Sequence, residues 1–135
     1  MLRKFLIFLR DVEDAAILSK FLKNIGFKGK IMLAALDVAY IPVDKMIVRL
    51  NNIEWIKDCL SCFEGLEVEV RTVKYNGSIP PAEALLEVAK EGDYHLIIVT
   101  RRNIVRGVGM DLALAIAGIS SIPVLVVPFE GFGVI

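Results

Sequence analysis

The sequence predicts an α/β fold, a five-stranded parallel sheet with helices on both faces in a Rossmann-like arrangement. Apolar runs of strand length alternate with amphipathic segments of helix length along the whole chain. Parallel strands need crossover connections, usually helices, and these bury both faces of the sheet, so its strands are apolar throughout. A chain of 135 residues has the length of one domain, and we expect a single domain over residues 1–135.

The composition is strongly apolar and carries no net charge. Hydrophobic residues make up 56% of the chain, and 16 basic residues balance 16 acidic ones. Proteins that bind nucleic acids owe much of their affinity to cationic side chains that displace counterions. The charge balance therefore argues against a nucleic acid as a partner, and the high hydrophobicity excludes a disordered chain.

The first part of the chain predicts a strand, a helix and a second strand. The continuous apolar run 5–9 indicates a strand covered on both faces. Asp11, with Asp14 three residues later in an imperfect capping box, predicts the start of a helix, and Gly26 ends it. Another apolar run predicts the second strand at 31–36.

The middle of the chain predicts a long helix followed by an edge strand. Apolar residues recur every three or four positions from 44 to 63, a spacing that is typical of a helix with one buried face. Charged and apolar residues alternate imperfectly over 67–73, as expected for a half-exposed strand. The apolar positions of the helix are Met46, Leu50, Ile53, Ile56, Leu60 and Phe63.

The last part of the chain predicts two further helices and two further strands. Pro80 and Pro81 suit the first turn of a helix, which a buried strand at 96–99 follows. A loop rich in Arg and Gly then leads to a helix of small residues around 113–118 and to a last apolar strand at 124–127.

The segment 112–129 is free of charged residues and is long enough to raise the alternative of a membrane span. Glycine, serine and proline interrupt this segment in its middle, which favours a short helix, a turn and a buried strand. The apolar stretch near the N-terminus is too short for a signal peptide. We therefore expect a cytoplasmic protein without a membrane span.

The second half of the chain resembles the universal stress protein family. The resemblance is carried by Gly77-Ser-Ile-Pro-Pro81 and the amphipathic helix after it, by Leu96-Ile-Ile-Val99, and by Pro123-Val-Leu-Val-Val127. It covers roughly residues 66–128 and is only topological before them. The resemblance implies the strand order 3-2-1-4-5, with a ligand crevice at the carboxyl ends of strands 1 and 4, where the order reverses.

The nucleotide-binding members of the family carry an Asp after strand 1 and the motif Gly-x2-Gly-x9-Gly-Ser/Thr after strand 4. This chain departs from both patterns, because Arg10 stands at the position of the Asp, with Asp11 next to it. Thr100 and Asn103 stand at the first two glycines, and Asp111 stands where a hydroxyl would meet a phosphate. A carboxylate there repels phosphate, so we expect no ATP binding of the standard kind.

The best candidates for a binding site are cationic residues at this crevice. They suit a small anion or a nucleotide, or they are solvated loop charges paired with Asp11 or Asp111. Glycines in the same loop could hold phosphate in a modified pose, and Asp37 and Tyr40 end strand 2 near the place of an adenine. The candidate site residues are Arg10, Asp11, Asp37, Thr100, Arg101, Arg102, Arg106, Gly107 and Gly109.

The two cysteines and the histidine are expected to have structural roles. Cys59 and Cys62 lie toward the carboxyl end of a predicted helix, where the helix dipole does not activate a thiol, so we expect them to be buried and unreactive. His95 is the only histidine and starts strand 4, at the end of the sheet away from the crevice. No Ser/His/Asp set and no metal site is therefore expected there.

The favoured hypothesis is a non-enzymatic regulatory or interaction module of the stress-protein type, without a cofactor. The resemblance implies a homodimer, and the apolar edge strand 124–127 would be protected by a partner strand. The apolar tail 129–135 could cover that partner. The alternatives are a stress-response regulator that binds an adenine nucleotide through the Arg and Gly loop, and an enzyme that hydrolyses or transfers an adenylate.

Overall fold

The structure is a computed structural model that describes residues 4–38, 41–43, 46–48, 55–75, 78–102 and 112–129. Its first half contains β1 (Lys4–Phe8), α1 (Val12–Asn24), β2 (Lys30–Val38), β3 (Ile41–Val43), β4 (Met46–Val48), α2 (Trp55–Cys59) and a 3₁₀ helix (Leu60–Phe63). Its second half contains β5 (Glu67–Tyr75), α3 (Pro81–Ala89), β6 (Leu96–Arg102), α4 (Leu112–Ile119) and β7 (Val124–Phe129).

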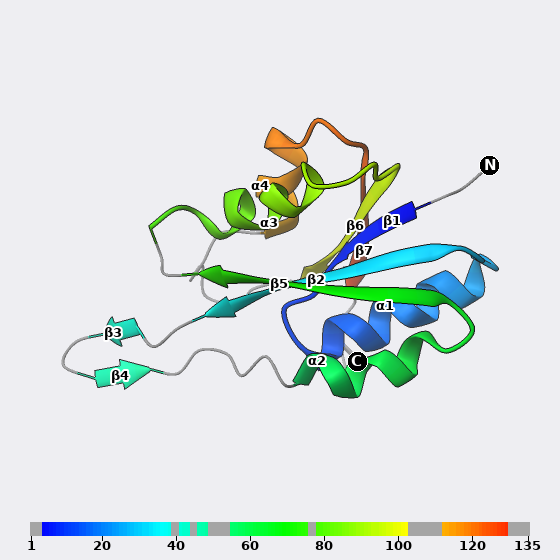
Figure 1. The fold of residues 1–135 in the computed structure, drawn as a ribbon, viewed down its shortest axis with the longest axis horizontal. Coiled ribbons are helices and arrows are strands. Elements are labelled where there is room, and N and C mark those ends of the chain that lie inside the picture. The colour runs from blue at the N-terminus through cyan, green and yellow to red at the C-terminus, as the bar shows by residue number, and fades with distance from the viewer. Residues whose placement is uncertain are drawn as a thin grey trace.

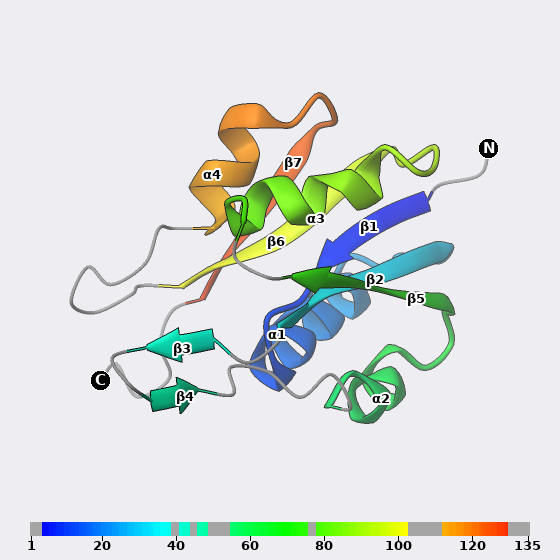
Figure 2. The same cartoon turned by 60° about the vertical axis from the view of Figure 1, so that its left-hand side comes forward.

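The central sheet has five parallel strands in the order β5-β2-β1-β6-β7. This order is the predicted 3-2-1-4-5, so both the fold class and the topology are confirmed. Helices α1 and α2 cover one face, and α3 and α4 cover the other (Figures 1 and 2). The first strand lies in the middle of the sheet, as expected for an apolar segment buried on both faces.

Each face of the sheet has its own hydrophobic core. Side chains alternate between the faces along a strand, so Leu6 and Phe8 of β1 pack toward α3 and α4. Their neighbours Ile7 and Leu9 pack toward α1 and α2. All four side chains are buried, so the end of β1 is held firmly between the two layers.

The predicted helix over 44–63 is wrong in its first half. Strands β3 and β4 form a small antiparallel pair, so Met46–Val48 is strand where helix was predicted, while the described residues from Trp55 to Phe63 are helical (Figure 2). The physical reason is that a short apolar run such as Met46–Val48 fits either periodicity, and here it pairs with the preceding β-favouring segment Ile41–Val43.

The two edges of the sheet differ in character. Strand β5 carries charged, exposed side chains on an edge, as the alternating pattern predicts. Strand β7 forms the other edge and contains no charged residue. Strand β6 is longer than predicted, because it continues through Arg101 and Arg102.

The apolar segment 112–129 divides into α4, a turn and β7, as the interruption by small and turn residues predicts. Within the part of the chain that the structure describes, no helix is long and apolar enough to cross a membrane.

Candidate functional site

The candidate site lies where β1 and β6 separate at their carboxyl ends. The two strands pair from Phe5–Leu96 to Ile7–Ile98. Beyond this point β1 stays with β2, because the amide of Leu9 donates a hydrogen bond to the carbonyl of Ala34 at 2.9 Å. Strand order reverses here, and ligands of open α/β sheets bind at such a point.

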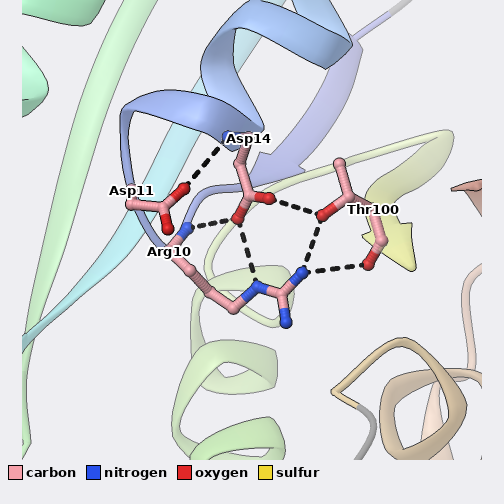
Figure 3. Close-up of polar contacts among 4 residues, drawn as sticks. All are labelled: Arg10, Asp11, Asp14 and Thr100. Carbon is pink, nitrogen blue, oxygen red and sulfur yellow. Dashed lines mark hydrogen bonds and ion pairs between the residues drawn. The ribbon is translucent and has the colours of Figure 1, made fainter. Parts of the chain in front are cut away.

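The side chain of Arg10 bridges this separation (Figure 3). Its Nη2 donates a hydrogen bond to the hydroxyl oxygen of Thr100 at 2.8 Å and a longer one to the Thr100 carbonyl at 3.4 Å. Its Nε lies 3.1 Å from a carboxylate oxygen of Asp14. The guanidinium therefore joins the end of β1 and the first turn of α1 to β6.

Asp14 is the centre of this network. Its side chain is only 1% exposed, and its Oδ2 accepts hydrogen bonds from the Arg10 amide at 2.7 Å and from Arg10 Nε. Its Oδ1 accepts a short hydrogen bond of 2.6 Å from the hydroxyl of Thr100, which is also buried. A buried carboxylate needs such partners, because an uncompensated buried charge is strongly unfavourable.

The N-terminus of α1 also lies at this point, and its own side chains occupy it. Asp11 is the N-cap, and its Oδ1 accepts a hydrogen bond from the amide of Asp14 at 3.1 Å. Glu13 adds a third carboxylate in the same turn. A helix N-terminus attracts anions through its exposed amides and its dipole, but here Asp11 already caps it and the first turn carries two further carboxylates, Glu13 and Asp14. The arrangement therefore disfavours a phosphate at α1.

The structure brings only some of the predicted site residues together. Arg10, Asp11 and Thr100 lie in or next to the network. Arg101 is exposed near the end of β6, and Arg102 is the last residue of that strand. In the backbone of β2, Asp37 stands opposite Lys74 of β5. The predicted residues Tyr40, Asn103, Arg106, Gly107, Gly109 and Asp111 lie outside the described residues.

Asp14 is the site residue that sequence reasoning missed, because it was assigned only to a capping box. Its side chain accepts a hydrogen bond from the amide of Arg10, the residue before the N-cap Asp11. The available signal was the pair of opposite charges, Arg10 just before the predicted helix and Asp14 in its first turn.

The two cysteines differ in their surroundings. Cys59 is buried and Cys62 is partly buried, and both are thiols. Burial above all, together with the neighbouring Cys62 and Asp58, raises the pKa of the Cys59 thiol from 9.0 to about 11. A reactive cysteine needs a lowered pKa, so the structure agrees with the inert role predicted for Cys59, while Cys62 is less buried than predicted.

His95 lies at the opposite end of the sheet from Arg10. Its Nδ1 accepts a hydrogen bond from the amide of Lys4 at 3.1 Å, and its own amide donates to the Lys4 carbonyl at 2.9 Å. The histidine thus helps to join the beginnings of β1 and β6. Across the described ranges, no three His, Cys, Asp or Glu side chains come together in a way that could hold a metal ion.

No protein-family model matches this sequence, and no curated protein matches it either. Its fold is similar to that of a universal stress protein from Archaeoglobus fulgidus, with a TM-score of 0.59, 14% sequence identity and coverage of 93% of each chain. It is also similar to a universal stress protein from Archaeoglobus fulgidus in complex with dAMP, with a TM-score of 0.56, 14% identity and coverage of 92% of this chain and 96% of that one. The chain therefore has the fold of the universal stress proteins.

Proposed function

We propose that this protein is a universal-stress-protein-like regulatory or interaction module that acts as a homodimer and does not bind ATP in the family's standard way. The observation that carries the proposal is the Arg10, Asp14 and Thr100 network, which fills the point where a ligand would enter between β1 and β6. An entering nucleotide would have to displace the guanidinium and expose a buried carboxylate.

Electrostatics support the same conclusion. Phosphate groups carry negative charge, and Asp11, Glu13 and Asp14 place three carboxylates in the first turn of α1 and its cap. The sequence adds Asp111 at the motif position where family members use a hydroxyl. Like charges in a partly desolvated site repel one another strongly.

The homodimer is supported by the exposed edge of the sheet. Strand β7 is apolar and has no neighbour on its outer side in the described sheet. Unprotected edge strands tend to pair with other chains, and two-fold dimers are the commonest homo-oligomers.

Calorimetric titration with ATP, ADP and AMP in the presence of magnesium tests the proposal. We expect no binding in the micromolar range. Micromolar binding that is lost in the Arg101→Ala/Arg102→Ala double variant would overturn the proposal in favour of a nucleotide-dependent regulator. Light scattering of the same samples over a range of protein concentrations tests the dimer.

A second candidate function is that of an adenine-nucleotide-binding regulator. It is favoured by one specific observation, that one of the similar structures is a complex with dAMP. Arg101 is exposed near the carboxyl end of β6, where it could meet a phosphate from outside the Arg10 network. This candidate predicts that Arg101→Ala weakens nucleotide binding while Arg71→Ala, at an exposed arginine of β5, does not.

A further inference from the structure

We propose that the end of α1 and the turn that follows it bind the surface of a membrane that contains anionic lipids. The binding surface, which we call the lysine turn, consists of Lys20, Lys23, Ile25 and Lys28. Its lysines meet the lipid headgroups, and Ile25 enters the boundary between the headgroups and the acyl chains. The inference goes beyond the proposed function and depends neither on the homodimer nor on how the chain treats ATP.

The charge pattern of this part of the chain is one-sided. Between Asp14 and Asp37 the sequence contains four lysines and no aspartate or glutamate, although the whole chain carries no net charge. The three lysines of the lysine turn are exposed. None of them forms an ion pair with another residue that the structure describes. Their charges are therefore available to an anionic partner.

Two further lysines at the same end of the sheet already have partners. Lys30 begins β2 and forms an ion pair of 3.1 Å with Glu67, the first residue of β5. Lys4 begins β1, opposite Lys30 in the register of the two strands, and lies over the ring of Tyr94 at 5.0 Å. Because these two cations are engaged within the molecule, the proposal rests on the three lysines of the lysine turn.

Backbone hydrogen bonds fix the shape of the lysine turn. The amide of Gly26 donates to the Lys23 carbonyl at 3.1 Å, and the amide of Phe27 donates to the Leu22 carbonyl at 3.0 Å. These two bonds form a Schellman motif, in which the glycine takes a positive φ, here 68°. A surface whose backbone is already ordered loses less conformational freedom when it binds.

The same motif separates the apolar side chains of the turn. Phe27 stacks on Phe5 of β1, with the ring centroids 4.3 Å apart, and both pack against the core. Ile25 is 54% exposed. A single exposed apolar residue is ordinary, but Ile25 lies between lysines in the sequence. The turn between α1 and β2 also lies at one end of the long axis of the molecule, where a flat surface can reach it (Figure 1).

This combination favours a lipid surface over a nucleic acid. Peripheral membrane segments combine lysines, which attract anionic headgroups, with apolar side chains that enter the interface. A nucleic acid would use the lysines but leave Ile25 in water, and single strands stack their bases on exposed aromatic rings. The aromatic rings of this part of the chain, Phe21 and Phe27, pack against the core. An anionic membrane therefore matches both kinds of side chain in the lysine turn.

Sedimentation with lipid vesicles tests the proposal. The unmodified chain is mixed at low salt with vesicles of phosphatidylcholine and phosphatidylserine in a three-to-one ratio, or of phosphatidylcholine alone. We expect the protein to sediment only with the anionic vesicles and to be released at high salt, because salt screens the attraction. Failure to sediment with the anionic vesicles, or equal sedimentation with both kinds, would overturn the proposal.

Removal of the three charges locates the binding surface. The variant Lys20→Gln/Lys23→Gln/Lys28→Gln should bind the anionic vesicles about 100-fold more weakly, because each lysine near such a surface contributes about fivefold. The single variants, each expected to bind about fivefold more weakly, keep the test decisive if the triple variant does not fold. Circular dichroism checks the fold of each protein.

The matched control removes the same number of charges elsewhere. Lys57→Gln/Lys74→Gln/Lys90→Gln changes exposed lysines of α2, of β5 and of the residue after α3. It should weaken binding by less than about fivefold, because these positions lie outside the lysine turn. Equal losses in the two triple variants would overturn the assignment of binding to the lysine turn.

Two further measurements test the lipid itself. Ile25→Ser keeps every charge and should weaken binding about fivefold, since about half of this side chain is free to be buried. Unchanged binding of this variant would overturn insertion of the turn into the interface. Binding of the unmodified chain to polyglutamate or to a single-stranded oligonucleotide, as tight as to the anionic vesicles, would overturn the membrane as the partner.

Discussion

Asp14 accepts two hydrogen bonds from Arg10, one from its backbone amide at 2.7 Å and one from its guanidinium Nε at 3.1 Å. Asp14 thus binds the backbone just after β1 and also pairs with the guanidinium of Arg10, which reaches across to β6. Because the carboxylate is buried, each of these bonds replaces water that the carboxylate has lost. The first turn of α1 and the carboxyl ends of two strands are thereby joined in one polar unit.

The first prediction concerns the ion pair. Arg10→Ala should lower the free energy of unfolding by about 3–5 kcal/mol, because it leaves a buried carboxylate without its charge partner. Urea denaturation at pH 7 followed by circular dichroism measures the change. Lys20→Ala, at an exposed cation of α1, is the matched control and should change stability by no more than about 0.5 kcal/mol. Equal effects of the two variants would contradict the assigned role of Arg10.

The second prediction concerns the buried hydroxyl. Thr100→Val keeps the shape of the side chain but removes the donor to Asp14 and the acceptor for Arg10 Nη2. We expect a loss of about 1–3 kcal/mol in the free energy of unfolding. Thr100→Ser retains the hydroxyl and should lose distinctly less. If the Val variant were as stable as the Ser variant, the hydroxyl would have no part in the network.

The third prediction concerns thiol reactivity. Since the pKa of Cys59 is raised to about 11 by burial, its thiol stays protonated at pH 8, and Cys62 should react with iodoacetamide much faster. Peptide mass spectrometry of the native protein resolves the two sites. Preferential labelling of Cys59 would contradict the structure.

The same pKa predicts how stability depends on alkaline pH. A thiol of raised pKa favours the folded state at every pH below its unfolded value of 9.0, and this contribution is lost as pH rises from there through about 11. Cys59→Ala should reduce the fall in stability over that interval. Denaturation midpoints measured at intervals from pH 8 to pH 11 compare the two proteins, and identical slopes would rule out a contribution from this thiol.

The fifth prediction concerns the outer surface of α4. Leu114→Lys places a charge on a residue that is 71% exposed, so the fold should tolerate it. The proposed dimer should be weaker and should dissociate at a higher protein concentration than the unmodified dimer. Ile25→Lys is the control, because Ile25 is 54% exposed at the end of α1, away from β7. Sedimentation velocity measures both variants. A dimer that Leu114→Lys and Ile25→Lys weaken equally would show that α4 takes no specific part.

Much of the fold could be predicted because its signals are local. Asp11 and Gly26 mark the two ends of α1, and the structure confirms the N-cap bond of Asp11 and the positive φ of 68° at Gly26. The apolar run at β1 predicted a central strand because a strand buried on both faces has no polar side to show.

The rest depended on contacts that sequence spacing does not contain. The strands β3 and β4 are apolar segments of three residues each, too short for a period of two to be told from a period of three or four. Asp14 could be placed on a helix, but its partner Thr100 is 86 residues away along the chain. These two side chains come together only because β6 pairs with β1 in the sheet.

The sheet divides the interior into two cores, and this division affects how the sequence can change during evolution. Leu6 and Ile7 are adjacent in the chain, yet they belong to different cores and share few neighbours. The effects of two substitutions depend on one another mainly when the two residues are in contact. Compensating substitutions should therefore occur among residues of the same core rather than between neighbours along one strand. Two separate sets of substitutions can then accumulate side by side, which suits a chain that keeps a common architecture at 14% identity.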